Sequence, residues 1–320
     1  MPLSTNLKCL LFADDNTTLT SGSDIIEVGN FVNYELQKLG QWLRSNELAT
    51  NTQKTKIIIF SNKKTVPDFP FVLNQNDVEC SISDSSLISP IERITNKSKT
   101  PFIKLLGVHF DENLTFEFHV DKVCKKINSA LYYINAVKHF LSSKSLLKLY
   151  YALIHSHFVY CLPVYSFTNS KNINILVVKQ KRCMRIITKS RYNAHTEPLF
   201  FNLKVLPLND LITYHKLIFM HSLAHQYCAV HYPHFITNYE LNLHRFELRN
   251  DKDFFVYRNN SALIKRMPLI DFPSAWNDLD TELKEIASKP LFKKIIKLNF
   301  LDKYSNFTCQ NTLCLSCMNI

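Results

Sequence analysis

The stretch Leu10-Leu11-Phe12-Ala13-Asp14-Asp15 (residues 10–15) decides how the start of this chain folds. Two adjacent carboxylates follow an apolar run, and a β-prone segment, residues 17–20, comes directly after them. This order predicts a β-hairpin with both aspartates at its tip. Neighbouring carboxylates repel each other unless solvent or a cation compensates them. The pair therefore indicates either a solvated turn or a metal-binding tip.

The next hundred residues predict a helix and strands. Residues 25–43 have an apolar face at helical spacing, and Ser23 or Asp24 is placed to cap that helix. Residues 57–60 are continuously apolar, which predicts a strand buried on both faces. Residues 61–100 are polar and serine-rich, so we expect an irregular connector with one strand near residues 71–73. Residues 103–110 predict a further strand.

The pattern then becomes helical. Apolar residues recur at three- and four-residue steps over 120–141 and 146–158, and two further helices are expected at 173–187 and 208–226. Short polar connections between them suit a helix bundle. Periodicity weakens from residue 231 until a basic amphipathic helix at 283–301. The predicted fold class is α+β.

Residues 149–170 contain no Asp, Glu, Lys or Arg and are long enough to suggest a membrane span. They also contain His155, His157, Pro163 and several tyrosines. These polar positions favour a buried helix that ends before Pro163. We expect no membrane partner, and core imidazoles rather than metal ligands at the two histidines.

The composition indicates a folded protein that binds polyanions. The chain has 320 residues, 46% of them hydrophobic, which suffices for two or three domains. The net charge of +11 and the pI near 9.1 favour nucleic acid as a partner. Four glycines argue against glycine-rich phosphate loops. Nine cysteines without a signal peptide suggest an intracellular protein, in nucleus or cytoplasm, that is not secreted.

The helix at 173–187 lies within the clearest electrostatic signal. Seven basic residues occur around it with no acidic residue between them: Lys171, Lys179, Lys181, Arg182, Arg185, Lys189 and Arg191. A one-sign cluster repels itself, and a phosphate backbone would relieve that repulsion. Tyr150, Tyr151 and Tyr192 could add stacking on single strands. The alternative is a solvated basic face.

Three cysteines near the end, Cys309, Cys314 and Cys317, form a C-x4-C-x2-C tail. Structural zinc takes four ligands, and no histidine or cysteine follows Cys317. The missing fourth ligand argues against a zinc site in this tail.

Several ordered motifs resemble the reverse transcriptases of non-LTR (LINE-type, jockey-like) retrotransposons. Residues 11–15 are similar to their acidic box of an aromatic residue, Ala and Asp-Asp. Further matches follow in order: residues 39–43 (LGQWL), 46–51 (NELATN), 54–56 (KTK), 105–108 (LLGV) with Asp111, 114–116 (LTF) and His119, then Tyr150, 153–154 and Tyr160, and 272–277 (FPSAWN). The resemblance runs almost from end to end.

The resemblance implies the C-terminal part of such an enzyme. Residues 1–111 would be the end of the palm, 112–230 a helical thumb-like domain, and 231–320 a C-terminal region with a basic helix and the cysteine tail. The partners would be an RNA template and a DNA primer; the oligomeric state is not determined. The family's first catalytic aspartate precedes the acidic box, where only thirteen residues are present here.

The resemblance also implies roles for single residues. Asp14 and Asp15 would hold Mg²⁺, or Mn²⁺ in its place, for two-metal nucleotidyl transfer. Lys54 would assist the departing pyrophosphate, and Gly107 would bring the backbone near the primer end. The alternatives are an ordinary surface lysine before a strand and a glycine required by strand geometry. We expect a fragment of an RNA-directed DNA polymerase, inactive alone. The alternative is a non-catalytic nucleic-acid-binding remnant of a retroelement.

Overall fold

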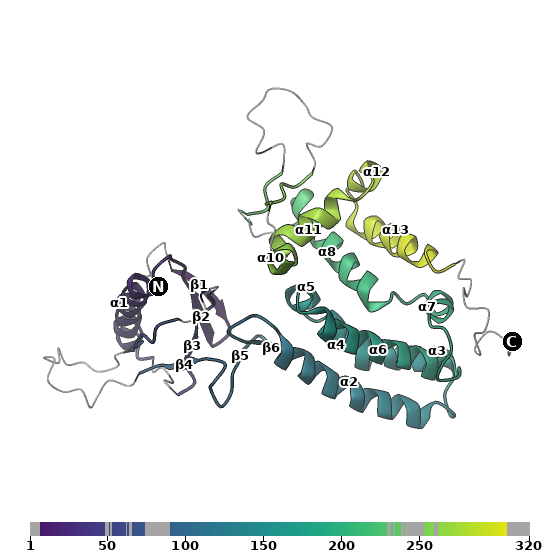
Figure 1. The fold of residues 1–320 in the computed structure, drawn as a ribbon, viewed down its shortest axis with the longest axis horizontal. Coiled ribbons are helices and arrows are strands. Elements are labelled where there is room, and N and C mark those ends of the chain that lie inside the picture. The colour runs from purple at the N-terminus through teal and green to yellow at the C-terminus, as the bar shows by residue number, and fades with distance from the viewer. Residues whose placement is uncertain are drawn as a thin grey trace, which may run out of the picture. The chain divides into compact units, whose positions relative to one another are not determined.

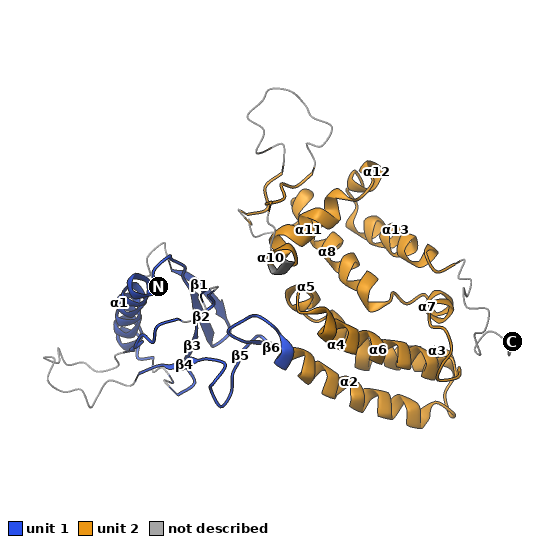
Figure 2. Cartoon of the chain, viewed as in Figure 1, with its two compact units in different colours: residues 1–118 blue, residues 119–320 orange. Residues whose placement is uncertain are grey.

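The computed structural model describes residues 7–48, 51, 53–61, 63, 66–73, 90–228, 232, 234–237, 240, 253–258 and 262–305. The chain divides into two compact units, residues 1–118 and 119–320 (Figures 1 and 2). The first unit carries the described strands and one long helix, and the second is built from helices. The predicted α+β class is confirmed.

The chain begins with the predicted hairpin. β1 (Lys8–Phe12) pairs antiparallel with β2 (Asp15–Leu19), and Phe12 lies opposite Asp15. Ala13 and Asp14 close the turn, which requires Ala13 to adopt a left-handed φ of 51°. An L-residue pays roughly 1–2 kcal/mol for that conformation.

Helix α1 (Ile25–Ser45) packs on the small core of the first unit. The Asp24 side chain caps it by accepting a hydrogen bond from the Ile26 amide. A Cβ added at Gly29 would lie 2.5 Å from the Phe69 ring, so only glycine permits this contact. The core consists of Phe71, Leu73 and Ile91, with partly buried side chains from α1 and residues 57–69 around it.

Strand β3 (Lys56–Ile58) pairs in parallel with β4 (Glu92–Ile94), which lies inside the expected irregular connector. The prediction that residues 57–60 are buried on both faces is wrong, since Ile57 to Ile59 are half-buried and Phe60 is exposed. Among the described residues this sheet has two strands, and Ile57 and Ile59 pack against the small core of the unit. Near residues 71–73 there is an isolated bridge between Val72 and Pro90 rather than a strand.

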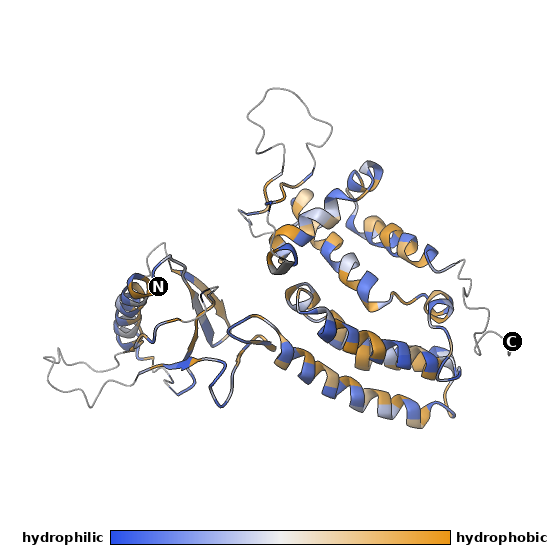
Figure 3. Ribbon diagram, viewed as in Figure 1, coloured by the Kyte–Doolittle hydropathy of each residue, from blue (hydrophilic) through white to orange (hydrophobic). Residues whose placement is uncertain are grey.

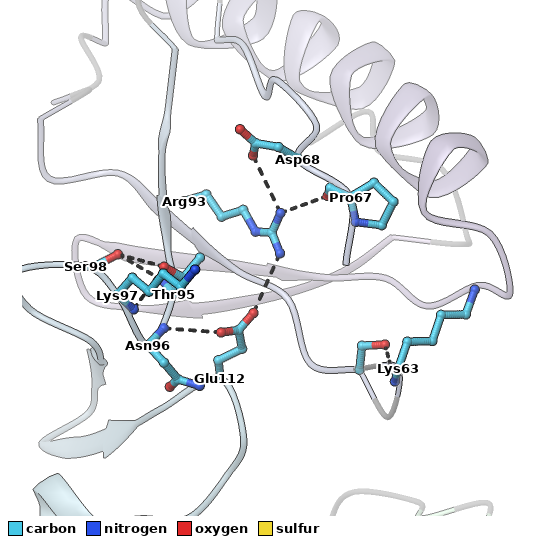
Figure 4. Close-up of polar contacts among 10 residues, drawn as sticks. Lys63, Pro67, Asp68, Arg93, Thr95, Asn96, Lys97, Ser98 and Glu112 are labelled. Atoms are coloured by element: carbon cyan, nitrogen blue, oxygen red, sulfur yellow. Dashed lines mark hydrogen bonds and ion pairs between the residues drawn. The ribbon is translucent and has the colours of Figure 1, made fainter. Parts of the chain in front are cut away.

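Arg93 on β4 joins separate segments of the first unit (Figure 4). Its guanidinium donates to the Pro67 carbonyl at 2.9 Å and lies 3.6 Å from both Asp68 and Glu112. Glu112 also accepts from the Asn96 amide at 3.2 Å. These contacts tie β4 to the loop that leaves the last strand of the unit.

The single strand predicted over 103–110 is in fact a second hairpin. β5 (Ile103–Leu105) pairs antiparallel with β6 (Val108–Phe110), and Leu106 and Gly107 form the two-residue turn. Both have positive φ, 45° and 86°, as a type I′ turn requires. The sequence did not predict this turn, because Leu106 occupies a position where glycine or asparagine is usual.

The buried carboxylate of Asp111 shapes the loop that follows β6. It accepts hydrogen bonds from the backbone amides of Asn113, Thr115 and Phe116, at 3.2, 2.9 and 2.7 Å. Leu114 and Phe116 both have left-handed φ, and the Phe116 side chain is fully buried. The three amide bonds compensate for that backbone strain.

The second unit starts with a layered set of helices. They are α2 (Glu117–Val137), α3 (Ser143–Tyr150), the π-helix η2 (Tyr151–His155), α4 (Ser156–Val159), α5 (Leu162–Tyr165), α6 (Ser170–Ile187), α7 (Glu197–Leu203) and α8 (Leu208–Ala224). Each long helix mixes apolar and polar positions, as amphipathic helices do when they pack (Figure 3). The expected helices at 120–141, 146–158, 173–187 and 208–226 correspond to α2, α3 to α4, α6 and α8.

A second core joins α8 to the C-terminal helices α10 (Ala262–Lys265), α11 (Pro268–Asn277), α12 (Thr281–Lys284) and α13 (Lys289–Asp302). Trp276 is its largest buried side chain. Asn277 pairs with both the amide and the carbonyl of Phe254, at 3.0 and 2.8 Å. The helix expected at 283–301 is broken, because Glu285 to Ser288 separate α12 from α13.

Candidate nucleic-acid interface and metal site

The two aspartates of the first hairpin lie at its tip. Asp14 is the second residue of the turn and Asp15 the first residue of β2. Both are exposed, and within the described part of the chain neither carboxylate has a hydrogen-bond or ion-pair partner. They are therefore accessible to a cation from solvent, with carboxylate oxygens of the kind that Mg²⁺ prefers.

A two-ion site needs more carboxylates than this pair. Among the described residues, no group of three His, Cys, Asp or Glu side chains is placed to hold a metal ion. Cys309, Cys314 and Cys317 lie outside the described residues, so the argument against zinc in the tail remains a prediction.

The strands that carry the aspartates expose apolar side chains on both faces. Leu10 and Phe12, which share one face, are 56% and 64% exposed, and Leu11 on the other face is 69% exposed. Apolar residues in sequence along a strand are typical of sheets covered on both sides. In the described residues, the hairpin forms a sheet of two strands only.

Lys54 and Gly107 belong to the same unit as the aspartates. Lys54 is exposed, and its backbone amide donates to the Asn51 side chain at 3.1 Å in a tight turn before β3. Gly107 is a turn residue of the β5–β6 hairpin, and its φ of 86° explains why glycine is needed there. The structure brings neither residue into a recorded contact with Asp14 or Asp15.

The seven basic residues from Lys171 to Arg191, most of them on α6, are here called the basic row, and several of them have partners inside the protein. Lys179 donates to Asn128 at 2.7 Å, Lys181 lies 3.7 Å from Glu197, and Arg185 donates to the Ala194 carbonyl at 2.8 Å. In the sequence, no acidic residue lies between the members of the row. In the fold, Glu197 of α7 lies next to Lys181.

Four other members of the row are exposed: Lys171, Arg182, Lys189 and Arg191. No side-chain hydrogen bond or ion pair engages them in the described part of the chain. Lys189 has a left-handed φ of 56°, where α6 ends. This half of the row is available to a phosphate backbone.

The tyrosines near the row differ in their availability. Tyr192 is 89% exposed and Tyr151 is 37% exposed. Tyr150 is fully buried and accepts a hydrogen bond from Gln180 at 2.9 Å, so the prediction that it stacks on nucleic acid is wrong. Burial raises the pKa of its hydroxyl far above the ordinary value, which excludes an ionised tyrosine there.

Gln180 holds α6 in place and was not singled out by the sequence. Besides Tyr150, it donates to the Leu206 carbonyl at 3.0 Å and accepts from the Leu208 amide at 2.7 Å. It is fully buried although it lies between two lysines in the sequence. Its position on the inner face of α6 is the only sequence signal that could have identified it.

The second unit also explains the FPSAWN segment, residues 272–277. Trp276 fills the core and Asn277 clamps Phe254, so this motif supports the fold of the unit. Across the residues that the structure describes, no helix is both long enough and apolar enough to cross a membrane.

Over 204 residues, the chain is 24% identical to the "RNA-directed DNA polymerase from mobile element jockey" of Drosophila funebris. The match covers 63% of this chain and 20% of that polymerase, so the chain spans about a fifth of the relative's length. No protein-family model matches the chain. No solved structure shows a significant match. The similarity to the jockey polymerase supports a relationship between this chain and the reverse transcriptases of LINE-type elements.

Proposed function

We propose that this chain is part of an RNA-directed DNA polymerase of a non-LTR retrotransposon. The observation that carries the proposal is the hairpin that presents Asp14 and Asp15, exposed and unpaired, at its turn. In this proposal residues 1–111 are the end of the palm, 112–230 the thumb and 231–320 a C-terminal region. The similarity to the jockey polymerase supports the same assignment.

The two aspartates would hold divalent cations, Mg²⁺ or Mn²⁺. Bound there, such ions would supply activation of a 3′-hydroxyl and charge neutralisation of a triphosphate. Asp14 lies in the turn and Asp15 begins a strand, so their side chains diverge and the pair alone is poorly placed to bridge two ions. Lys54 would stabilise the departing pyrophosphate.

We infer that a further segment completes both the sheet and the metal site. The side chains of Leu10, Leu11 and Phe12 are exposed, although a continuous apolar run of this kind is typical of strands in sheets that are covered on both faces. A segment that covers them would also be positioned to bring another carboxylate to the hairpin tip. We therefore expect this 320-residue chain to be inactive as a polymerase on its own.

Primer extension tests this directly. The chain alone should not extend a DNA primer on an RNA template in Mg²⁺ or Mn²⁺, whereas a fusion at its N-terminus to a reverse-transcriptase segment that carries the further catalytic aspartate should do so. Asp14→Asn should abolish the activity of the fusion, and Glu27→Gln, at an exposed carboxylate of α1, should leave it unchanged. Extension by the unfused chain that depends on Asp14 would contradict the proposal of an incomplete site.

The row on α6 would grip the template–primer duplex through phosphates. Its affinity should fall steeply with salt, because each neutralised phosphate contributes a slope of about 0.9. Replacing Arg182, Lys189 and Arg191 with glutamine should flatten the log–log salt slope by about two to three units. Lys181→Gln and Arg185→Gln should matter less, because internal partners already engage these side chains. An equal slope in the triple variant would exclude α6 from the interface.

A non-catalytic nucleic-acid-binding remnant is the second candidate. The absence of a third carboxylate near the hairpin, among the described residues, favours it. In that case the fusion would bind the RNA–DNA hybrid with the same salt dependence and still fail to extend a primer.

A further inference from the structure

The exposed surface between helices α2 and α6 combines positive charge with apolar and aromatic side chains. The two helices lie side by side and are joined by a hydrogen bond of 2.7 Å from Lys179 of α6 to Asn128 of α2 (Figure 1). Beside this bond, α6 forms an open groove of about 550 Å³ that is lined by Ser170, Lys171, Asn174, Ile175, Val178 and Lys179. This groove and the neighbouring Tyr132 of α2 are here called the α2–α6 face.

The middle of the groove is apolar and open to solvent. Ile175 and Val178 are 41% and 64% exposed. They follow Lys171 and precede Arg182 at three- and four-residue steps, so all four side chains share one face of α6. Eleven residues of helix place Lys171 and Arg182 roughly 16 Å apart along the axis. The groove therefore offers an apolar floor between two exposed cations.

Tyr132 adds an aromatic ring from α2. It lies one helical turn after Asn128, on the side of α2 that contacts α6. Its side chain is 72% exposed, and the ring of Tyr133 lies edge-on to it with centroids 5.8 Å apart. Among the described residues, no hydrogen bond or ion pair engages the side chains of Tyr132 or Lys171. An accessible ring thus lies beside an accessible ammonium group.

The charge of this part of the chain has one sign. From residue 122 to residue 196, a stretch that includes α6 and most of α2, the sequence has thirteen lysines and arginines and no aspartate or glutamate. The acidic residues at its two limits are engaged, because Asp121 pairs with Lys125 at 2.7 Å and Glu197 lies 3.7 Å from Lys181. A polyanion is the partner that complements such a surface.

We propose that the α2–α6 face binds single-stranded nucleic acid. Lys171 and Arg182 would hold backbone phosphates, while one base stacks on Tyr132 and another packs on Ile175 and Val178. The exposed ring and apolar floor favour an unpaired strand, because the base faces of a duplex are already covered by their neighbours. The inference rests on the proposed nucleic-acid binding of the basic row and adds the type of strand, but it does not require polymerase activity.

Fluorescence anisotropy of the 320-residue chain with a labelled ten-nucleotide oligouridylate tests the proposal. Tyr132→Ala should weaken binding about five- to twentyfold through lost stacking, whereas Tyr132→Phe, which keeps the ring, should stay within about twofold. Val178→Asp introduces a carboxylate beside the phosphates and should weaken binding at least about tenfold.

Two matched variants serve as controls. Leu298→Asp introduces the same charge at an exposed apolar position of α13, and Tyr257→Ala removes an exposed tyrosine outside α2 and α6. Both should leave the affinity within about twofold, because neither change removes a stacking contact or alters the charge of the α2–α6 face.

A ten-base-pair RNA–DNA hybrid separates this inference from the proposed function. Tyr132→Ala should leave hybrid affinity within about twofold, since stacking on the ring needs an unpaired base. The Arg182/Lys189/Arg191 variant should still lower it. Hybrid binding without oligouridylate binding would refute the α2–α6 face alone. Loss of both would refute the nucleic-acid role of the basic row as well.

Three further outcomes would overturn the proposal. The first is equal oligouridylate affinity in Tyr132→Ala and Val178→Asp, with helical circular dichroism intact. The second is an equal loss of hybrid affinity in Tyr132→Ala, which would make this face a duplex surface. The third is displacement of the oligouridylate by an equal concentration of decaglutamate, which would assign the face to an acidic protein segment.

Discussion

Replacing Gln180 with leucine should uncouple α6 from the bundle. The change leaves the Leu208 amide without an acceptor, and the Leu206 carbonyl and Tyr150 hydroxyl without a donor, all in a fully buried setting. Each orphaned group costs about 1–3 kcal/mol, and the added apolar contact of leucine offsets part of the sum. We expect the free energy of unfolding of the second unit to fall by about 3–5 kcal/mol, a large share of the roughly 5–15 kcal/mol typical of domains.

Urea unfolding followed by tryptophan fluorescence measures this loss. The chain has two tryptophans, so a Trp42→Phe background leaves Trp276 as the reporter of the second unit. Asn174→Ala, an exposed position on the same helix, is the control and should change stability by no more than about 0.5 kcal/mol. Adding Tyr150→Phe to Gln180→Leu removes one orphaned group and should recover about 1 kcal/mol. A loss below about 1 kcal/mol for Gln180→Leu would refute this account of how α6 is held.

Three other outcomes are expected. Gly29→Ala should destabilise the first unit by about 1–3 kcal/mol, because the new methyl meets the Phe69 ring at 2.5 Å, and Phe69→Leu should relieve part of it in a double-mutant cycle. Asp111→Asn should cost about 2–3 kcal/mol, because the amide's single acceptor oxygen replaces a carboxylate that serves three backbone amides; hydrogen exchange at Phe116 would report it, and unchanged protection would contradict it. The pKa of His155 is about 4 in the folded chain and 6.5 in the unfolded chain, so between these pH values only the unfolded chain binds this proton. The free energy of unfolding therefore falls as the pH decreases from 6.5 to 4. His155→Gln should remove roughly 1–3 kcal/mol of that fall after solvent screening, and identical pH profiles would disprove the assignment.

Local patterns predicted much of the secondary structure, because local signals need no knowledge of distant residues. The acidic pair between two β-prone runs predicted the first hairpin, and helical spacing predicted α1, α2, α6 and α8. Pro163 correctly marked a boundary: the helix before it ends at Val159, and Pro163 is the second residue of the next short helix. The turn at Leu106 and Gly107 was missed, because an uninterrupted apolar run gives no sign of where a chain reverses.

What the sequence by itself determined was a hairpin with two aspartates at its tip, followed by amphipathic helices and an excess of positive charge. Only the tertiary structure decided which charges are available. Glu197 lies outside the basic row in the sequence, yet folding brings it to Lys181, and Tyr150 is buried in the core with a hydrogen bond from Gln180. His215 and Lys297 lie far apart in the sequence, and both act on the pKa of His155 in a fold where α8 and α13 pack together. Side-chain periodicity is a local property, whereas the pairing of charges depends on which helices become neighbours.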